Sequence, residues 1–137
     1  MPKTKTFVDA NVLISAFRGK EEVSEKALKV LDDPEREFIV SNYLRLEVIP
    51  KPKFLRRDDE VAFMETFFES ASEEVDSSSA LTLQAIEIAS IHNLHPLDAL
   101  HASAAIHAEV DEFITSEKKT KPFSRVHNLT VKSLLGR

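Results

Sequence analysis

The stretch at residues 4–17, TKTFVDANVLISAF, joins a strand-like run to a helix-like run through a single acid. Thr4 to Val8 is short and ends in apolar side chains, which predicts a buried β-strand that stops at Asp9. From Asn11 to Phe17 the apolar residues fall near one face of a helix. A strand that leads directly into a helix is the first unit of an alternating α/β chain.

The same alternation continues along the rest of the sequence. Gly19 is expected to end the first helix, Asp32-Asp33-Pro34 the second, and Pro50 and Pro52 the third. Short apolar runs and helical periodicity predict the remaining elements. The expected strands cover 37–40, 73–75, 112–115 and 129–131, and the expected helices cover 21–31, 42–48, 58–71, 81–92 and 97–108.

Strands that alternate with helices predict a mainly parallel sheet covered by helices on both faces. The 137 residues contain no repeat, low-complexity tract or linker, so one compact domain spanning 1–137 is expected. Ligands of such sheets bind beyond the carboxyl ends of the strands. Asp9 and the pair Ser116-Glu117 both lie just past a predicted strand end, so we expect a site at that edge.

The composition narrows the classes of function. The formal net charge of −5 argues against binding a nucleic-acid duplex by bulk electrostatics, although a bound cation can reverse the local charge of a carboxylate site. Cysteine is absent, which excludes disulfides, thiolate zinc sites and a cysteine nucleophile. We find no export signal and no apolar run of membrane-spanning length, so a cytoplasmic protein with no membrane contact is expected.

Eight of the 18 basic residues gather in two groups. Each group is either a solvated surface or a contact surface for RNA, and the sequence favours neither. The first group contains Lys51, Lys53, Arg56 and Arg57, and the second contains Lys118, Lys119, Lys121 and Arg125.

Two acidic residues in the first third of the chain are candidate ligands. Asp9 follows the first strand, where it either binds a ligand or caps the next helix, and Asn11 has the same two interpretations, as an orienting or a capping residue. Glu47 lies on a short, mostly apolar helix, where a carboxylate needs a cation or an arginine as its partner. The alternative for Glu47 is an exposed side chain that pairs with Lys51 at i+4.

Two further acids lie near the end of the chain. Asp98 is in the first turn of an alanine-rich helix, where the helix dipole favours an anion and small neighbours allow another element to approach. Glu117 follows a strand, as Asp9 does, and its alternative is a turn residue paired with Lys121. None of the four is decisive alone, but acids that converge at one sheet edge supply the oxygen ligands that Mg²⁺ or Mn²⁺ prefers.

The five histidines form no zinc motif such as H-E-x-x-H. His101, three residues after Asp98, is within reach of a hydrogen bond to it, but such a position is more typical of a half-buried structural histidine. The glycine-rich phosphate-binding motifs and G-x-S-x-G are absent, and the chain has two glycines in all. Phosphate-cradling loops are therefore excluded.

Four blocks of the sequence together resemble the PIN-domain family. They are FVDANVLIS at 7–15, SNYLRLEV at 41–48, LDALHA at 97–102 and FITSE at 113–117, and their order and spacing match along essentially the whole chain. The VapC ribonuclease toxins of toxin–antitoxin pairs are the best-known small members. The resemblance implies a three-layer α/β/α domain with a central parallel sheet of about five strands.

The resemblance also implies a site and an activity. Mg²⁺ or Mn²⁺ would be held by Asp9, Glu47 and Asp98, and the ion would activate water for hydrolysis of an RNA phosphodiester bond. The family often has an aspartate at the fourth acidic position, which Glu117 matches here, so its longer side chain leaves direct ligation open. Two polar residues are expected to support these four acids: Asn11 and Ser116.

Two other classes of function remain. The first is a PIN-like module that binds RNA or a protein partner without cutting, which the glutamate at position 117 keeps open. The second is a phosphotransfer fold, which also places an aspartate after its first strand. An aspartate-nucleophile phosphatase would need a second aspartate at position 11, where this chain has Asn11, and a receiver domain would need adjacent acids at that strand end.

The expected partners follow from the same resemblance. Small PIN domains often pair, so a homodimer is expected, and the toxin members imply an antitoxin protein as a candidate partner. Phe63, Phe67 and Phe68 on the expected 58–71 helix are candidates for such an interface, with core packing as the more usual role of these residues.

Overall fold

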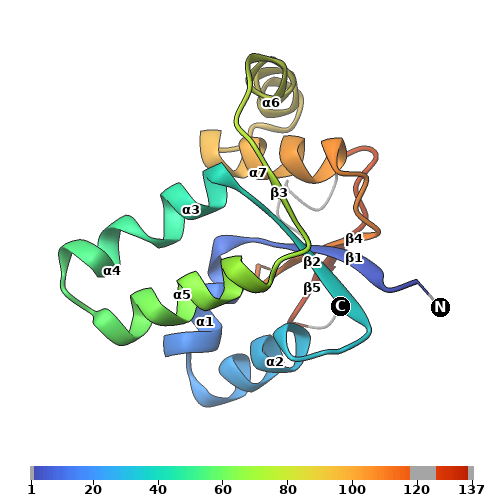
Figure 1. Cartoon of the computed structure of the whole chain (residues 1–137). Helices are drawn as coiled ribbons and strands as arrows, with labels where there is room; N and C mark the ends of the chain where they lie inside the picture. Colours follow the sequence, from blue (N-terminus) through green and yellow to red (C-terminus); the bar gives the residue numbers. More distant parts are fainter. Residues whose placement is uncertain (1, 118–125, 136–137) are drawn as a thin grey trace.

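A parallel five-stranded sheet lies between layers of helices in the computed structural model, which describes residues 2–117 and 126–135 (Figure 1). All four strand pairings are parallel. The strands are β1 (Thr4–Val8), β2 (Arg36–Ser41), β3 (Glu73–Val75), β4 (Glu112–Thr115) and β5 (Val131–Ser133). The helices are α1 (Ala10–Arg18), α2 (Glu21–Leu31), α3 (Asn42–Val48), α4 (Pro50–Phe54), α5 (Asp58–Ser70), α6 (Ser79–His92) and α7 (Pro96–His107).

The strand order is β3-β2-β1-β4-β5, which makes β1 the central strand. The chain leaves β1 towards β2 on one side and returns later to β4 on the other. In α/β sheets, ligands bind at such a reversal, beyond the carboxyl ends of the strands. Here that edge is formed by the ends of β1 and β4, and we call it the crevice. Asp9 follows β1 directly, and Glu117 comes two residues after β4.

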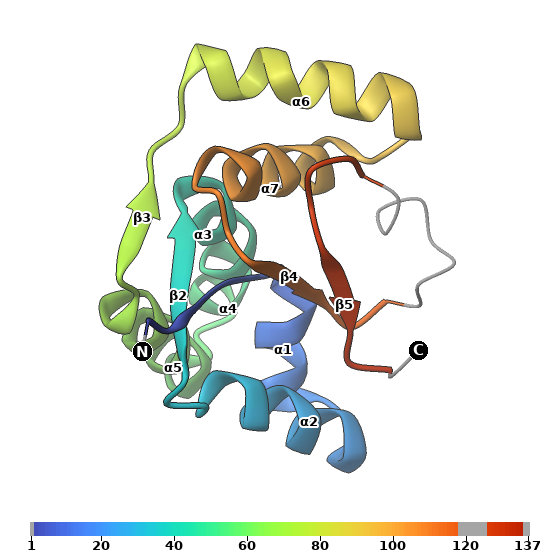
Figure 2. The same ribbon diagram turned by 90° about the vertical axis from the view of Figure 1, so that its right-hand side faces the viewer.

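Alternating side chains of the central strands build a core on each face of the sheet. Phe7 and Phe113 stack at 5.3 Å between ring centroids on the face covered by α6 and α7, and their strand neighbours Val8 and Ile114 pack into the other core. Figure 2 shows α6 and α7 on one side of the sheet and α1 and α2 on the other. The predicted three-layer α/β/α architecture is confirmed.

The helix ends follow from local hydrogen bonding. The side chains of Asp9 and Ser41 accept bonds from the backbone N–H groups of the third residue on, as N-caps do. Gly19 ends α1 as predicted, but in extended backbone rather than in a left-handed turn. A Cβ at this position would lie 2.6 Å from the carbonyl oxygen of Ser15, so the close approach explains the glycine.

One helix was not predicted, and one strand boundary was wrong. The predicted helix 42–48 is confirmed as α3, but Pro50 then starts the unpredicted helix α4, where its missing N–H costs nothing. The last strand begins at Val131 and not at Leu129, which weak periodicity could not place.

The aromatic residues of α5 belong to the core. Phe67 and Phe68 are buried, Phe67 packs edge-on against Phe38, and Phe63 is partly buried beside them. Core packing is therefore the role of Phe67 and Phe68, and the interface alternative was wrong for these two. Within the described residues, every helix is too short or too polar to cross a membrane.

Candidate functional site

The end of β1 and the end of β4 are held side by side. The backbone N–H of Asp9 donates to the carbonyl oxygen of Ile114 at 3.0 Å, which continues the β1–β4 pairing by one residue. The Asp9 side chain therefore starts from rigid backbone at the crevice. It is 8% exposed, and it accepts a hydrogen bond from the N–H of Val12 at 3.2 Å.

The environment of Asp9 disfavours a bare carboxylate. Burial raises the pKa of Asp9 from 3.8 to about 6, and the charge of Glu117 adds to the rise. The Thr115 hydroxyl, which hydrogen-bonds to Asp9, and the Val12 N–H lower the pKa in part, as does the His101 imidazole. A buried carboxylate in this environment is stabilised when a proton or a cation neutralises its charge.

Glu117 is held beside Asp9 by its backbone. Its N–H donates to the Thr115 hydroxyl at 3.1 Å, and its carbonyl oxygen accepts a bond from the Ser133 hydroxyl at 2.5 Å. The first bond closes a local turn after β4, and the second ties that turn to β5. The Glu117 carboxylate acts electrostatically on Asp9. The sequence predicted this neighbourhood for Glu117 but gave no role to Thr115, which links the two acids.

Within the site, the side chains of Glu47 and His101 are in direct contact. Glu47 Oε1 lies 2.6 Å from His101 Nε2, although 54 residues separate them in the sequence. His101 is fully buried, and its Nδ1 has no hydrogen-bond partner among the described residues. The alternative pairing of Glu47 with Lys51 is not seen, and His101 bonds to Glu47 rather than to Asp98.

Asp98 lies one helical turn before His101 on α7, and it is half-buried. Burial raises the pKa of Asp98 above its usual value, while the imidazole of His101 lowers it. The negative charge of Glu47 raises the pKa of Asp98 further, and His95 acts in the opposite direction. The pKa of Asp98 is therefore affected by Glu47, the same glutamate that is hydrogen-bonded to His101.

His101 thus relates to three of the four acids, Glu47, Asp9 and Asp98, which come from three separate segments. It hydrogen-bonds to Glu47 and acts electrostatically on both Asp9 and Asp98, while Glu117 acts on Asp9. In the part of the chain that the structure describes, no three His, Asp or Glu side chains are arranged as a ready-made metal shell.

The chemistry of these donors fits a hard divalent ion all the same. Mg²⁺ keeps several water ligands and is commonly bound through one or two protein carboxylates together with substrate phosphates. Burial is the main cause of the raised pKa values of Asp9 and Asp98, so a cation beside these two carboxylates would stabilise their ionised forms. Glu47, already bonded to His101, is better placed to orient a water than to complete a shell.

The two residues that were predicted to support the four acids form fewer contacts in the site. Asn11 is exposed on α1 and Ser116 is half-buried after β4, and neither side chain forms a hydrogen bond with another described residue. Their supporting role stays a prediction. The second basic group, at 118–125, lies outside the described residues.

Solved structures with the same fold come from bacterial toxin–antitoxin complexes. A chain of VapBC2 from Rickettsia felis, bound to a promoter DNA fragment, superposes with a TM-score of 0.70 at 16% identity, covering 95% of this chain and 98% of that one. DNA-bound VapBC from Salmonella typhimurium gives 0.69 at 17%, with 96% and 98% covered. A toxin–antitoxin complex from Klebsiella pneumoniae gives 0.69 at 20%, with 96% and 99% covered.

At these identities the structural neighbours establish the fold alone. No curated protein sequence matches the chain. The family model of the PIN domain, however, matches residues 6–128, which include all four acids, His101 and the crevice between β1 and β4. The chain is therefore a member of the PIN-domain family.

Proposed function

We propose that this chain is a divalent-metal-dependent endoribonuclease that hydrolyses RNA phosphodiester bonds. The observation that carries the proposal is the position of His101, which bonds to Glu47 and acts electrostatically on Asp9 and Asp98, while Glu117 acts on Asp9. Membership of the PIN family supports the nuclease class.

In this proposal each acidic residue has a distinct role. Asp9 and Asp98 would hold Mg²⁺ or Mn²⁺, and the ion would supply Lewis-acid activation for phosphodiester hydrolysis. Glu47, with one oxygen bonded to His101 Nε2, keeps its other oxygen for the attacking water. Glu117 adds negative charge beside Asp9, which strengthens the attraction for a cation.

We also propose an antitoxin protein as the partner of this chain, because the neighbours in fold are chains of toxin–antitoxin complexes. An antitoxin would keep such a nuclease inactive in the cytoplasm until the nuclease is released from the complex. Copurification of the chain with the product of an adjacent gene, followed by loss of nuclease activity in the complex, tests this part. A homodimer stays a further prediction, for which size-exclusion chromatography is the measurement.

Cleavage of labelled single-stranded RNA tests the activity itself. We expect cleavage in Mn²⁺ or Mg²⁺, none in EDTA, and none with Asp98→Asn. Glu21→Gln is the matched control, because Glu21 is also an acid in the first turn of a helix but is exposed on α2. Cleavage by Asp98→Asn at the wild-type rate would refute the assignment of the site.

A PIN-like module that binds without cutting is the second candidate. The absence of three ready-placed ligands in the described residues is the observation that favours it. Such a module would bind RNA or its partner equally well in Mn²⁺ and in EDTA, and it would leave the RNA intact in both.

A further inference from the structure

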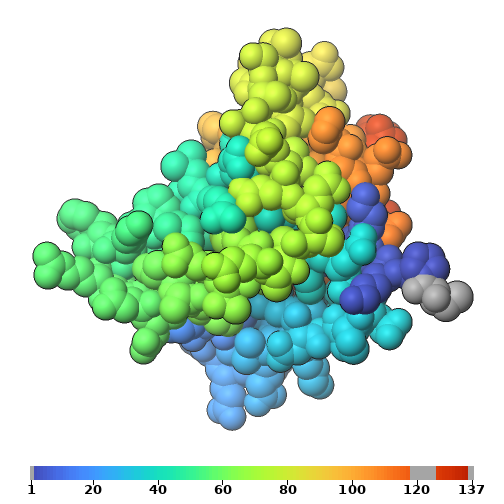
Figure 3. Space-filling view, in the orientation of Figure 1, coloured from blue at the N-terminus to red at the C-terminus, as the bar shows by residue number. Residues whose placement is uncertain are grey.

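The last residue of α4 is an aromatic residue that packs on almost nothing. Phe54 is 84% exposed, the highest value among the large exposed apolar side chains of the described residues. Burial of this apolar area against a ligand would contribute free energy that the isolated chain does not use. Figure 3 shows the turn between α4 and α5 projecting from one side of the molecule.

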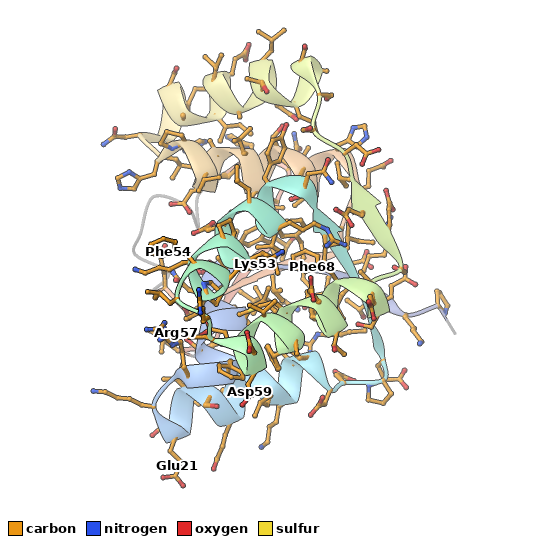
Figure 4. All side chains as sticks on the ribbon, turned by 60° about the vertical axis from the view of Figure 1, so that its left-hand side comes forward. Glu21, Lys53, Phe54, Arg57, Asp59 and Phe68 are labelled. Carbon is orange, nitrogen blue, oxygen red and sulfur yellow. The ribbon has the colours of Figure 1, made fainter. Side chains whose placement is uncertain are left out.

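The residues around Phe54 are positively charged. Residues 51–57 read KPKFLRR, with four basic side chains and no acid, although the whole chain carries a net charge of −5. We call these seven residues the 51–57 corner. Lys53 and Arg57 lie at the same end of the molecule as Phe54 in Figure 4. An exposed ring flanked by cations is the arrangement with which proteins hold single-stranded nucleic acid.

A buried acid organises the arginines beside this corner. Glu60 on α5 is 4% exposed, and its Oε1 lies 3.8 Å from Arg18 Nε and 4.0 Å from Arg57 Nη1. Both arginine side chains remain 40% exposed, so Glu60 fixes their inner side and leaves donors for a ligand. Asp58 and Asp59 line the hollow beyond them and bound the positive surface on that side.

The 51–57 corner lies next to Glu47, one of the four proposed site residues. A small cavity of about 80 Å³ is lined by Glu47 together with Arg18, Lys51, Arg57 and Glu60. Glu47 is therefore shared between the crevice, where it meets His101, and the basic surface. A strand of RNA held along the 51–57 corner would have its next phosphates beside Glu47.

We propose that the 51–57 corner binds single-stranded RNA, with Phe54 stacking on a base and Arg18, Lys51 and Arg57 contacting phosphates on the way to Glu47. This inference rests on the proposed ribonuclease function and adds a substrate-binding surface to it. Guanidinium groups suit phosphate because their planar donors bind two oxygens at once. An acidic peptide is the competing occupant, and Phe54→Leu separates the two, because stacking on a base requires the aromatic ring.

Fluorescence anisotropy of a labelled single-stranded RNA in EDTA tests the binding without cleavage. Phe54→Ala should weaken RNA binding by about 5- to 150-fold, the range for loss of one base–aromatic stack. Phe54→Leu, which keeps the apolar area, should lose as much as Phe54→Ala, while Phe54→Trp should bind at least as tightly as wild type. Ile91→Ala is the matched control, because Ile91 is 73% exposed on α6.

The salt dependence of binding tests the phosphate contacts. Arg57→Gln should reduce the slope of log affinity against log salt by about 0.7, the value for one phosphate contact on a single strand. Lys29→Gln, an exposed lysine on α2, should leave the slope unchanged.

Three results would overturn this inference: no saturable RNA binding by the wild-type chain, wild-type affinity in Phe54→Ala, or full affinity retained in Phe54→Leu. The last result would indicate an apolar protein contact. Because the assay contains no metal, its outcome is separate from that of the cleavage assay. A chain that cuts RNA but binds it independently of Phe54 keeps the nuclease function and loses this surface.

Discussion

Replacing Asp9 with asparagine should stabilise the metal-free protein, and by an amount that depends on pH. Burial raises the pKa of Asp9 from 3.8 to about 6 in the folded chain. This difference corresponds to about 3 kcal/mol. Because the folded pKa is above the unfolded one, the folded state loses stability as pH rises from about 4 to above 6.

An asparagine side chain cannot ionise, so the variant escapes this loss. Asparagine is as good an N-cap as aspartate, and its carbonyl oxygen can still accept from the N–H of Val12. We therefore expect Asp9→Asn to match wild type near pH 4 and to exceed it by up to about 3 kcal/mol at pH 8. The measurement is urea denaturation in EDTA at several pH values.

Asp59→Asn is the control, since this exposed aspartate on α5 should have no such effect at any pH. Adding Mn²⁺ should reverse the order of stability at pH 8, because only the wild-type protein gains binding free energy from the ion. Equal stability of Asp9→Asn and wild type across the pH range in EDTA would refute the burial argument for Asp9.

Three other predictions follow from individual contacts. Glu112→Ala should lower the free energy of unfolding by about 3 kcal/mol at pH 7, because Arg36 loses its 2.7 Å partner. The loss should be smaller at pH 3, because the hydrogen bonds of Glu112 outweigh its burial and hold its pKa below the usual value. Equal losses by urea denaturation at both pH values would contradict this prediction. Gly19→Ala should lower the free energy of unfolding by about 1–3 kcal/mol through the clash with Ser15, and an unchanged Tm would refute it. Mn²⁺ affinity measured by calorimetry should fall about tenfold from pH 7 to pH 5, as Asp9 takes up a proton, and a flat profile would argue against Asp9 as a ligand.

The sequence predicted the architecture well because buried strands and amphipathic helices have distinct apolar patterns. Adjacent side chains of β1, β2 and β4 enter two different cores, so these strands appear as short continuous apolar runs such as Phe7-Val8 and Phe113-Ile114. The parallel sheet then followed from the helices between the strands. The helix α4 was not predicted and β5 was placed two residues early; they are five and three residues long and carry little periodic signal.

The site was harder to predict because its contacts cross the chain. Asp9 and Glu117 could be placed at one sheet edge, since the carboxyl ends of parallel strands share it. The Glu47–His101 contact depends on how α3 packs against α7, which no local pattern encodes. Thr115 gave no signal, because a threonine at a strand end is ordinary until its hydroxyl is found beside Asp9.

Anomalous diffraction from a crystal of the protein soaked in Mn²⁺ would test the metal assignment most directly. We expect one peak in the crevice between β1 and β4, bonded to carboxylate oxygens of Asp9 and Asp98 at about 2.0–2.6 Å, the range for hard divalent cations. A crystal with an accessible crevice and no peak there, or with manganese bound only elsewhere, would contradict the proposal that these acids form a metal centre.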